Sequence, residues 1–223
     1  MEPKITIVEE KFYGRLKSRR LTDRQEALFK TLFKDISITS FKDINTCGYD
    51  DVFFEIGFGG GEHIANMALS NPKGLFIGCE PFVNGVAALL TKIDDLKIKN
   101  IRIYQNDARG LLKEFPDGFL SGVFLLFPDP WPKRKHIRRR FLQEKTIFMI
   151  HDKLKNNGFW RIASDQKEYK SWILKLFKQE NVQEKFQGVL FDRSSRPSFE
   201  TWPQTRYEQK AVEEILYAIY TKI

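Results

Sequence analysis

The sequence predicts an α/β protein built on a doubly wound, mostly parallel β-sheet. Short apolar segments recur along most of the chain, and several of them end in an acidic residue. Helix-like segments separate these apolar segments, which is the pattern of alternating strands and helices in parallel sheets. The segments are almost continuously apolar, as is typical of strands that helices cover on both faces.

Seven strands and four helices are expected in the main body of the chain. The strands are expected over residues 52–56, 75–80, 101–107, 122–127, 158–165, 186–192 and 214–223. The helices are expected over residues 61–70, 82–97, 139–154 and 166–179. A short connection between the last two strands would make one of them antiparallel.

The first 40 residues differ from this pattern and are predicted to be an N-terminal extension. A helix is expected over residues 22–34, because Thr22 and Gln25 have the spacing of a capping box. The residues before it are expected to be partly flexible. The predicted organisation is therefore an extension over residues 1–40 and one domain over residues 41–223.

The composition is that of a cytoplasmic globular protein. The chain has 223 residues, of which 42% are hydrophobic and 30% charged. It has no apolar run of the roughly 20 residues that a membrane span requires, and no apolar signal core near Met1. Cys47 and Cys79 form no CxxC pair, so neither a disulfide framework nor a zinc site is expected. We expect no membrane partner and no metal.

The net charge of +8 is concentrated in two segments. Residues 133–140 carry six Lys or Arg and no acid, and residues 11–24 carry six against the single acid Asp23. Basic segments on an otherwise near-neutral chain are typical of nucleic-acid binding. Solvated surface charge is the alternative, but the first of these segments lies beside a candidate site.

A glycine-rich loop, EIGFGGGEH (55–63), follows the first strand and opens a helix. Glycines at 57, 59 and 61 let a ligand approach the backbone, and the helix N-terminus favours polar groups. A dinucleotide fingerprint would need a third glycine at position 62. That position is Glu62, so a nicotinamide enzyme is disfavoured. A glycine-rich turn without a ligand is the alternative.

Acidic residues follow the next strands at the same predicted edge of the sheet. Glu80 ends the second strand, Asp107 the third and Asp165 the fifth, and Asp129 follows the fourth between two prolines. Ligands of doubly wound sheets bind at the carboxyl ends of the strands. Glu80 could accept hydrogen bonds from ribose hydroxyls and Asp107 one from an adenine amino group. Such an acidic pocket also suits a positively charged sulfonium.

The segment FPDPWPK (127–133) closely resembles the signature of the tRNA (guanine-N7-)-methyltransferase family. Other stretches agree with that family, and the resemblance covers most of the chain: GRLKSRRLTDRQ (14–25), EIGFGGGEH (55–63), GCE (78–80), NDA (106–108), ASD followed by Tyr169, RP (196–197) and TRYE (205–208). The resemblance implies a Rossmann-like class I methyltransferase fold. It also implies methyl transfer from S-adenosyl-L-methionine to N7 of a guanine in the variable loop of tRNA.

The resemblance also implies roles for individual residues. Asp129 would be the catalytic residue. The cofactor would be bound by Glu55, Gly57, Gly59, Gly61, Glu80, Asp107 and Asp129. The substrate would be bound by Lys133, Asp165, Thr205, Arg206, Tyr207 and Glu208. An RNA-contacting arm would consist of Lys135, His136, Ile137, Arg138, Arg139 and Arg140.

Two residues depart from the family pattern. Ser164 stands where the family often has Thr and keeps the hydroxyl, and Arg206 stands where Lys is common. Arg keeps the charge but differs in geometry, which puts its contact in doubt. The partner would be tRNA, and the protein a monomer or a homodimer.

Guanine N7 carries a lone pair and no proton, so its methylation needs no general base. We therefore expect Asp129 to act by orientation and electrostatics. Pro128 and Pro130 would hold it at the strand edge, and Trp131 would either stack on a base or belong to the core. The alternatives are a class I methyltransferase with another substrate and a non-catalytic RNA-binding protein on the same fold.

Overall fold

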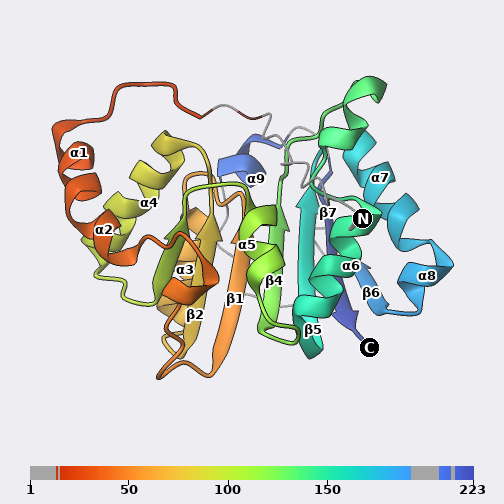
Figure 1. The fold of residues 1–223 in the computed structure, drawn as a ribbon. Helices are drawn as coiled ribbons and strands as arrows, with labels where there is room; N and C mark the ends of the chain where they lie inside the picture. The colour runs from red at the N-terminus through yellow and green to blue at the C-terminus, as the bar shows by residue number, and fades with distance from the viewer. Residues whose placement is uncertain (1–13, 15, 192–205, 212–213) are drawn as a thin grey trace, which may run out of the picture.

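The computed structural model describes residue 14 and residues 16–191, 206–211 and 214–223. The strands are β1 (Asp51–Ile56), β2 (Gly74–Cys79), β3 (Ile101–Tyr104), β4 (Leu120–Leu126), β5 (Leu154–Ser164), β6 (Phe186–Phe191) and β7 (Leu216–Lys222). They form one sheet in the order β3-β2-β1-β4-β5-β7-β6 (Figure 1). All seven expected strands are present, and residue 192 of the sixth lies outside the described residues.

The first five strands are parallel, as the alternation of strands and helices predicts. β7 is antiparallel to both of its neighbours, and Tyr220 pairs with Trp160 of β5 on one side and with Gly188 of β6 on the other. The prediction of one antiparallel strand is confirmed. Because β7 runs against β5, the start of β7 at Leu216 lies opposite Ser164, at the carboxyl ends of the parallel strands.

Helices cover both faces of the sheet (Figure 1). They are α1 (Asp23–Lys30), α2 (Leu32–Ile36), α3 (Glu62–Ser70), α4 (Val83–Leu96), α5 (Ala108–Glu114), α6 (Glu144–Lys153), α7 (Lys167–Phe177), α8 (Glu180–Gln183) and α9 (Arg206–Lys210), with 3₁₀ helices η1 (Phe41–Asp43) and η2 (Arg134–Arg139). Helices α5, α6 and α7 pack on one face, and α1, α3 and α4 on the other.

Alternating side chains of each central strand supply two hydrophobic cores. In β4, Val123 and Leu125 point to the face that packs against α5 and α6, whereas Phe124 and Leu126 point to the opposite face. All four are buried. This burial on both faces explains why the strand sequences are almost continuously apolar, and it makes the edge where the strands end a rigid platform.

The predicted N-terminal helix over residues 22–34 is interrupted at Thr31. The capping box of Thr22 and Gln25 is present, and α1 begins at Asp23. The Thr31 hydroxyl and backbone N–H both donate to the Ala27 carbonyl, and the backbone leaves the helical region. Such hydrogen bonds from Thr to the preceding turn compete with helix continuation. The chain restarts as α2, and Ser37 then pairs with Ile103 of β3.

Two further helix predictions differ from the structure. The helix expected over 139–154 begins at Glu144, because Gln143 and Thr146 form a capping box there and η2 takes up the preceding residues. Helix α5 was not predicted. It is short, and it begins at Ala108, directly after Asp107, whose side chain caps it by accepting a hydrogen bond from the Arg109 N–H.

Among the helices of the described residues, none is long and apolar enough to cross a membrane. The same part of the chain contains no cluster of three or more His, Cys, Asp or Glu side chains that could hold a metal ion.

Candidate active site

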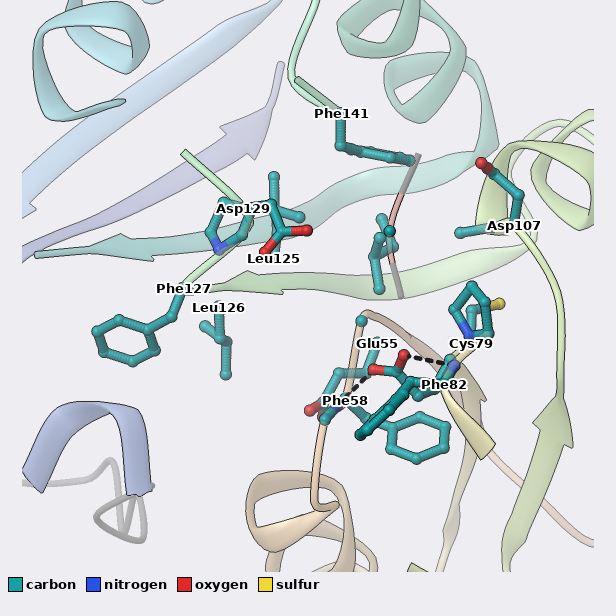
Figure 2. Close-up of a pocket in the computed structure, with 18 of the residues that line it drawn as sticks. Glu55, Phe58, Cys79, Phe82, Asp107, Leu125, Leu126, Phe127, Asp129 and Phe141 are labelled. Atoms are coloured by element: carbon teal, nitrogen blue, oxygen red, sulfur yellow. Dashed lines mark hydrogen bonds between the residues drawn. The ribbon is translucent and has the colours of Figure 1, made fainter. Parts of the chain in front are cut away.

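A pocket of about 440 Å³ lies at the carboxyl ends of β1, β2, β3 and β4. Four of the predicted acids line it: Glu55, Glu80, Asp107 and Asp129. Figure 2 shows Asp129 and Asp107 on opposite sides of this space, with Leu125 on the β4 side and Phe58 on the glycine-loop side. The strand-end acids that are far apart in the sequence therefore meet in one cavity.

The glycine loop presents backbone to this pocket. Gly57, Gly59 and Gly61 all have positive φ angles, which side chains rarely adopt. A Cβ at Gly57 would meet no atom within 4 Å, whereas one at Gly61 would lie 2.8 Å from Cβ of Leu89. Gly61 is thus needed where α3 packs closely on α4, and Gly57 leaves room at the pocket wall.

Glu80 is fixed at the pocket by two backbone donors. Its Oε2 accepts from the Gly59 N–H at 2.8 Å, and its Oε1 accepts from the Phe82 N–H at 3.0 Å. Burial raises the pKa of Glu80, and these two hydrogen bonds offset part of that effect. The carboxylates of Asp129 and Glu55 raise the pKa further. The glycine loop and the end of β2 are held together by this one side chain.

Glu55 is buried deeper than the other three predicted acids that line the pocket, with 4% of its surface exposed. Its Oε2 lies 2.6 Å from Nδ1 of His63, the second residue of α3. The His63 side chain is also buried, and its ring packs edge-on against Phe124. This pair ties the end of β1 to the start of α3 behind the glycine loop. His63 was not singled out from the sequence, although it ends the motif that identified the loop.

Asp107 is engaged by Arg109, a residue that the sequence analysis did not select. The Arg109 backbone N–H and Nε each donate to Oδ1 of Asp107 at 2.9 Å, and Nη2 binds Oδ2. Both residues line the pocket. The spacing of an acid and an arginine two residues later does not by itself predict this pair, because the pair depends on Asp107 being the N-cap of α5.

The loop that carries Asp129 has an unusual backbone. Phe127 and Trp131 both have positive φ angles, of 50° and 42°. Left-handed conformations of such residues cost about 1–3 kcal/mol each and persist where surrounding contacts hold them. The Phe127 N–H donates to the Ala163 carbonyl at 2.8 Å, which keeps the loop on β5.

Asp129 itself lies at the pocket rim and is exposed to solvent on one side. Within the described part of the chain, no donor is bonded to its carboxylate. Partial desolvation by the surrounding loop raises its pKa. The loop therefore presents an uncommitted carboxylate to whatever enters the pocket.

The predicted RNA arm forms η2 immediately beyond this loop. The Arg139 guanidinium lies 5.0 Å from the Trp131 ring, and His136 packs edge-on against the same ring. Lys135 and Arg138 are exposed, as an RNA-contacting role requires, and Ile137 is half-buried. Partial desolvation lowers the pKa of His136, and the nearby cations lower it further.

Arg140 departs from the prediction. Only 4% of its surface is exposed, and its guanidinium points inward to the loop of Asp129. A residue in this position cannot contact RNA phosphates as part of an exposed arm. The sequence could not separate it from its neighbours, because a run of Arg residues looks uniform until the backbone geometry turns one of them inward.

The structure places the predicted substrate residues at several depths. Lys133 is exposed beside the pocket, and Asp165 is half-buried at the end of β5, where its Oδ2 accepts from the Gln166 side chain. Thr205 and the side chain of Tyr207 lie outside the described residues. Glu208 is 3% exposed and accepts a hydrogen bond from the Tyr217 hydroxyl at 2.6 Å.

Arg206 connects this C-terminal segment to the glycine loop. Its Nε lies 2.7 Å from Oε1 of Glu62, and its guanidinium lies against Gly60. The antiparallel course of β7 brings α9 to the carboxyl edge of the parallel strands. Of the predicted substrate residues, Lys133, Asp165 and Arg206 lie at this edge with exposed or half-exposed side chains.

The sheet order with its reversed β7, the glycine loop and the row of strand-end acids define a class I methyltransferase. Solved structures share the fold. A 30S ribosomal A1408 methyltransferase from an uncultured bacterium is 18% identical, has a TM-score of 0.53 and covers 80% of this chain and 90% of its own. A structure described as "a putative methyltransferase" from Streptococcus mutans in complex with SAH is 13% identical and has a TM-score of 0.52. It covers 78% of this chain and 90% of its own.

Sequence comparisons identify the family within this class. A family model described as "Putative methyltransferase" matches residues 50–216. The tRNA (guanine-N(7)-)-methyltransferase of Zymomonas mobilis is 41% identical over 96% of this chain and 94% of its own. The enzyme of the same name from Caulobacter vibrioides is 38% identical over 89% of this chain and 88% of its own. The chain belongs to the tRNA (guanine-N(7)-)-methyltransferase family.

Proposed function

We propose that this protein transfers a methyl group from S-adenosyl-L-methionine to N7 of a guanine in tRNA, and that this guanine lies in the variable loop. The relatives that match most of the chain are named tRNA (guanine-N(7)-)-methyltransferases, which supports methylation of guanine N7 in tRNA. The observation that carries the proposal is the place of Asp129. Its carboxylate stands between an acidic pocket and an exposed basic arm.

The residues of the pocket fit S-adenosyl-L-methionine. A volume of about 440 Å³ is in the range of pockets for small ligands. The open space at Gly57 lets a ligand reach the backbone, and the oriented carboxylate of Glu80 can accept hydrogen bonds from ligand hydroxyls. Bound there, the cofactor would supply an electrophilic methyl group on a positive sulfur, which the surrounding carboxylates favour.

The chemistry assigns Asp129 to positioning and charge stabilisation. Guanine N7 is an acceptor with no proton to remove, so no base is required. A methylated guanine gains positive charge, and a carboxylate at Asp129 can stabilise that charge or accept from the N–H groups at the guanine edge. Correct positioning of two reactants lowers a barrier by about 7–11 kcal/mol, and a preorganised charge adds to this effect.

The arm and the C-terminal segment would present the tRNA to this carboxylate. The exposed Lys133, Lys135 and Arg138 would bind phosphates. Asp165, Thr205, Arg206 and Tyr207 would contact the nucleotide, and the buried Glu208 would act through its hydrogen bond from the Tyr217 hydroxyl. The enzyme would work in the cytoplasm, as a monomer or a homodimer.

The test is methyl transfer to bulk tRNA. The protein is incubated with tRNA and methyl-labelled S-adenosyl-L-methionine, and the tRNA is digested to nucleosides for analysis. Label in 7-methylguanosine, lost when the variable-loop guanine is replaced, is the expected result. Label in another nucleoside or in protein would overturn the proposal. Calorimetry with the cofactor alone would separate a non-catalytic RNA-binding protein from an enzyme with another substrate.

A further inference from the structure

Arg140 is buried against the loop that carries Asp129. Its Nε donates to the Pro130 carbonyl at 2.8 Å, and its Nη2 donates to the Trp131 carbonyl at 3.3 Å. These two carbonyls belong to the residues that directly follow Asp129. One guanidinium therefore holds two consecutive peptide units of the loop.

The loop depends on donors from elsewhere in the chain. Pro128, Pro130 and Pro132 have no N–H groups, so the loop can form few hydrogen bonds within itself. Trp131 also has a left-handed backbone that needs outside contacts to persist. A guanidinium has its donors in a rigid planar fork, which suits two neighbouring carbonyls better than an ammonium would.

Helix α7 holds Arg140 in this position. The guanidinium lies 5.5 Å from the Tyr169 ring and 5.4 Å from the Trp172 ring. Both rings are anchored at Leu142, because Trp172 Nε1 donates to the Leu142 carbonyl at 2.7 Å and the Tyr169 hydroxyl accepts from the Leu142 N–H. Cation–π contacts are strongest where water is excluded, and Tyr169 is fully buried.

No carboxylate of the described residues forms an ion pair with Arg140. Its charge is therefore committed to the loop carbonyls and the aromatic rings. Its neighbour Arg138 is exposed, and Arg139 lies on the Trp131 ring. The three consecutive arginines thus differ in what they contact: Arg138 faces solvent, Arg139 lies on the Trp131 ring, and Arg140 binds the loop of Asp129.

We propose that Arg140 is a positioning residue for methyl transfer, which holds the Pro130 and Trp131 carbonyls so that the Asp129 carboxylate keeps its place at the pocket rim. This inference rests on the proposed function for its kinetic test. It predicts that losing the guanidinium lowers turnover without weakening tRNA binding. Losing a phosphate-binding arginine should instead weaken tRNA binding without lowering turnover.

The experiment compares Arg140→Lys with the matched control Arg102→Lys. Both variants keep the charge, and Arg102 also donates to two carbonyls, those of Lys99 and Ile101, but does not line the pocket. For Arg140→Lys, kcat should fall by about 100-fold, which is the effect of a misplacement near 1 Å. KM for tRNA should stay within a factor of about 3, whereas the loss of a direct contact worth roughly 1.4 kcal/mol would raise KM about tenfold. Arg102→Lys should keep both kcat and KM for tRNA. An Arg140→Lys enzyme with unchanged kcat, or with a loss confined to KM, would overturn the inference.

A second measurement is independent of methyl transfer. Amide hydrogen exchange at Phe127, whose N–H donates to the Ala163 carbonyl at the start of the loop, should be faster in Arg140→Lys than in the wild type, and unchanged in Arg102→Lys. Equal exchange in all three proteins would overturn the inference even if the enzyme methylates tRNA. Conversely, faster exchange in a protein that modifies no tRNA would keep the conclusion that Arg140 holds the loop of Asp129 and would reject the proposed function.

Trp172→Leu serves if Arg140→Lys does not fold. It leaves the arginine in place and removes one of the rings that holds it, so a smaller loss in kcat is expected, of about 3- to 10-fold from a cation–π contact. Wild-type kcat together with wild-type exchange at Phe127 would overturn the inference.

Discussion

The Glu62 carboxylate and the Arg206 guanidinium lie 2.7 Å apart and join the first residue of α3 to the first residue of α9. Glu62 also lies 3.6 Å from Lys92 of α4. The helix that opens after the glycine loop is therefore linked to the segment that we propose to contact tRNA. The two sides of the proposed reaction meet at this ion pair.

We predict that Glu62 and Arg206 act as a unit in tRNA binding. Arg206 is 58% exposed, so Glu62→Gln should change the free energy of unfolding by less than about 1 kcal/mol. Either Glu62→Gln or Arg206→Gln should raise KM for tRNA, and the double variant should be no worse than the worse single one. Strictly additive effects in this double-mutant cycle would contradict the prediction.

Gly57 and Gly48 offer a matched pair for cofactor binding. Both have positive φ angles, of 70° and 86°, and a Cβ at either would meet no atom within 4 Å. Gly57→Ala and Gly48→Ala should therefore lose similar stability, about 1–2 kcal/mol each. Only Gly57 lines the pocket, so only Gly57→Ala should weaken cofactor binding in calorimetry. Equal cofactor affinities would remove the glycine loop from the proposed cofactor site.

Asp129→Asn should retain the fold and cofactor affinity and lose at least about 100-fold in methyl transfer. The Asn side chain keeps the size of Asp129 but cannot stabilise a developing positive charge. Single-turnover assays with saturating tRNA would measure this loss. Near wild-type rates would remove Asp129 from the mechanism.

The pH dependence of the reaction should carry the mark of Asp129. Desolvation raises its pKa above the ordinary value of 3.8, so the required carboxylate should be lost at a higher pH than for a free Asp. The folded protein then binds this proton more tightly than the unfolded chain does. Its contribution to the free energy of unfolding should therefore rise as pH falls through the raised pKa, while turnover falls. Asp129→Asn should lack both changes in pH profiles of kcat and of urea unfolding.

The exposed part of the arm should dominate the salt dependence of tRNA binding. Each phosphate contact contributes about 0.7–0.9 to the slope of log affinity against log salt. Lys135→Glu combined with Arg138→Glu should weaken binding and flatten this slope. Lys42→Glu combined with Lys178→Glu, at two exposed positions that do not line the pocket, is the charge-matched control. A slope that does not respond to the arm variant would reject the arm as a phosphate-binding surface.

The sheet could be predicted from sequence because its strands carry their own signal. β1, β2 and β4 are apolar on both faces and are followed by glycine, acid or proline, so their ends are visible in the sequence. α5 was missed because a seven-residue helix offers too few turns for a periodic pattern. The break at Thr31 was missed because it depends on one hydroxyl bonding to the preceding turn.

The acids of the pocket could be predicted because parallel strands end at the same edge. Their partners could not, since Arg109 and His63 bind carboxylates through geometry that only the folded chain supplies. Arg140 was predicted with the arm, because burial depends on the turn of η2 and on two rings of α7 that lie about 30 residues away in the sequence.

The position of β7 has a consequence for synthesis on the ribosome. β7 follows β6 in the chain but lies between β5 and β6 in the sheet. Until β7 has been made, β5 is paired only with β4, and β6 has no partner in the sheet. Until then β5 presents an unpaired edge, and such edges invite aggregation and proteolysis. Because α9 reaches the pocket edge through the same strand, a nascent chain that lacks β7 should neither hold its sheet nor recognise its substrate. An incomplete copy is thus expected to aggregate rather than to occupy tRNA unproductively.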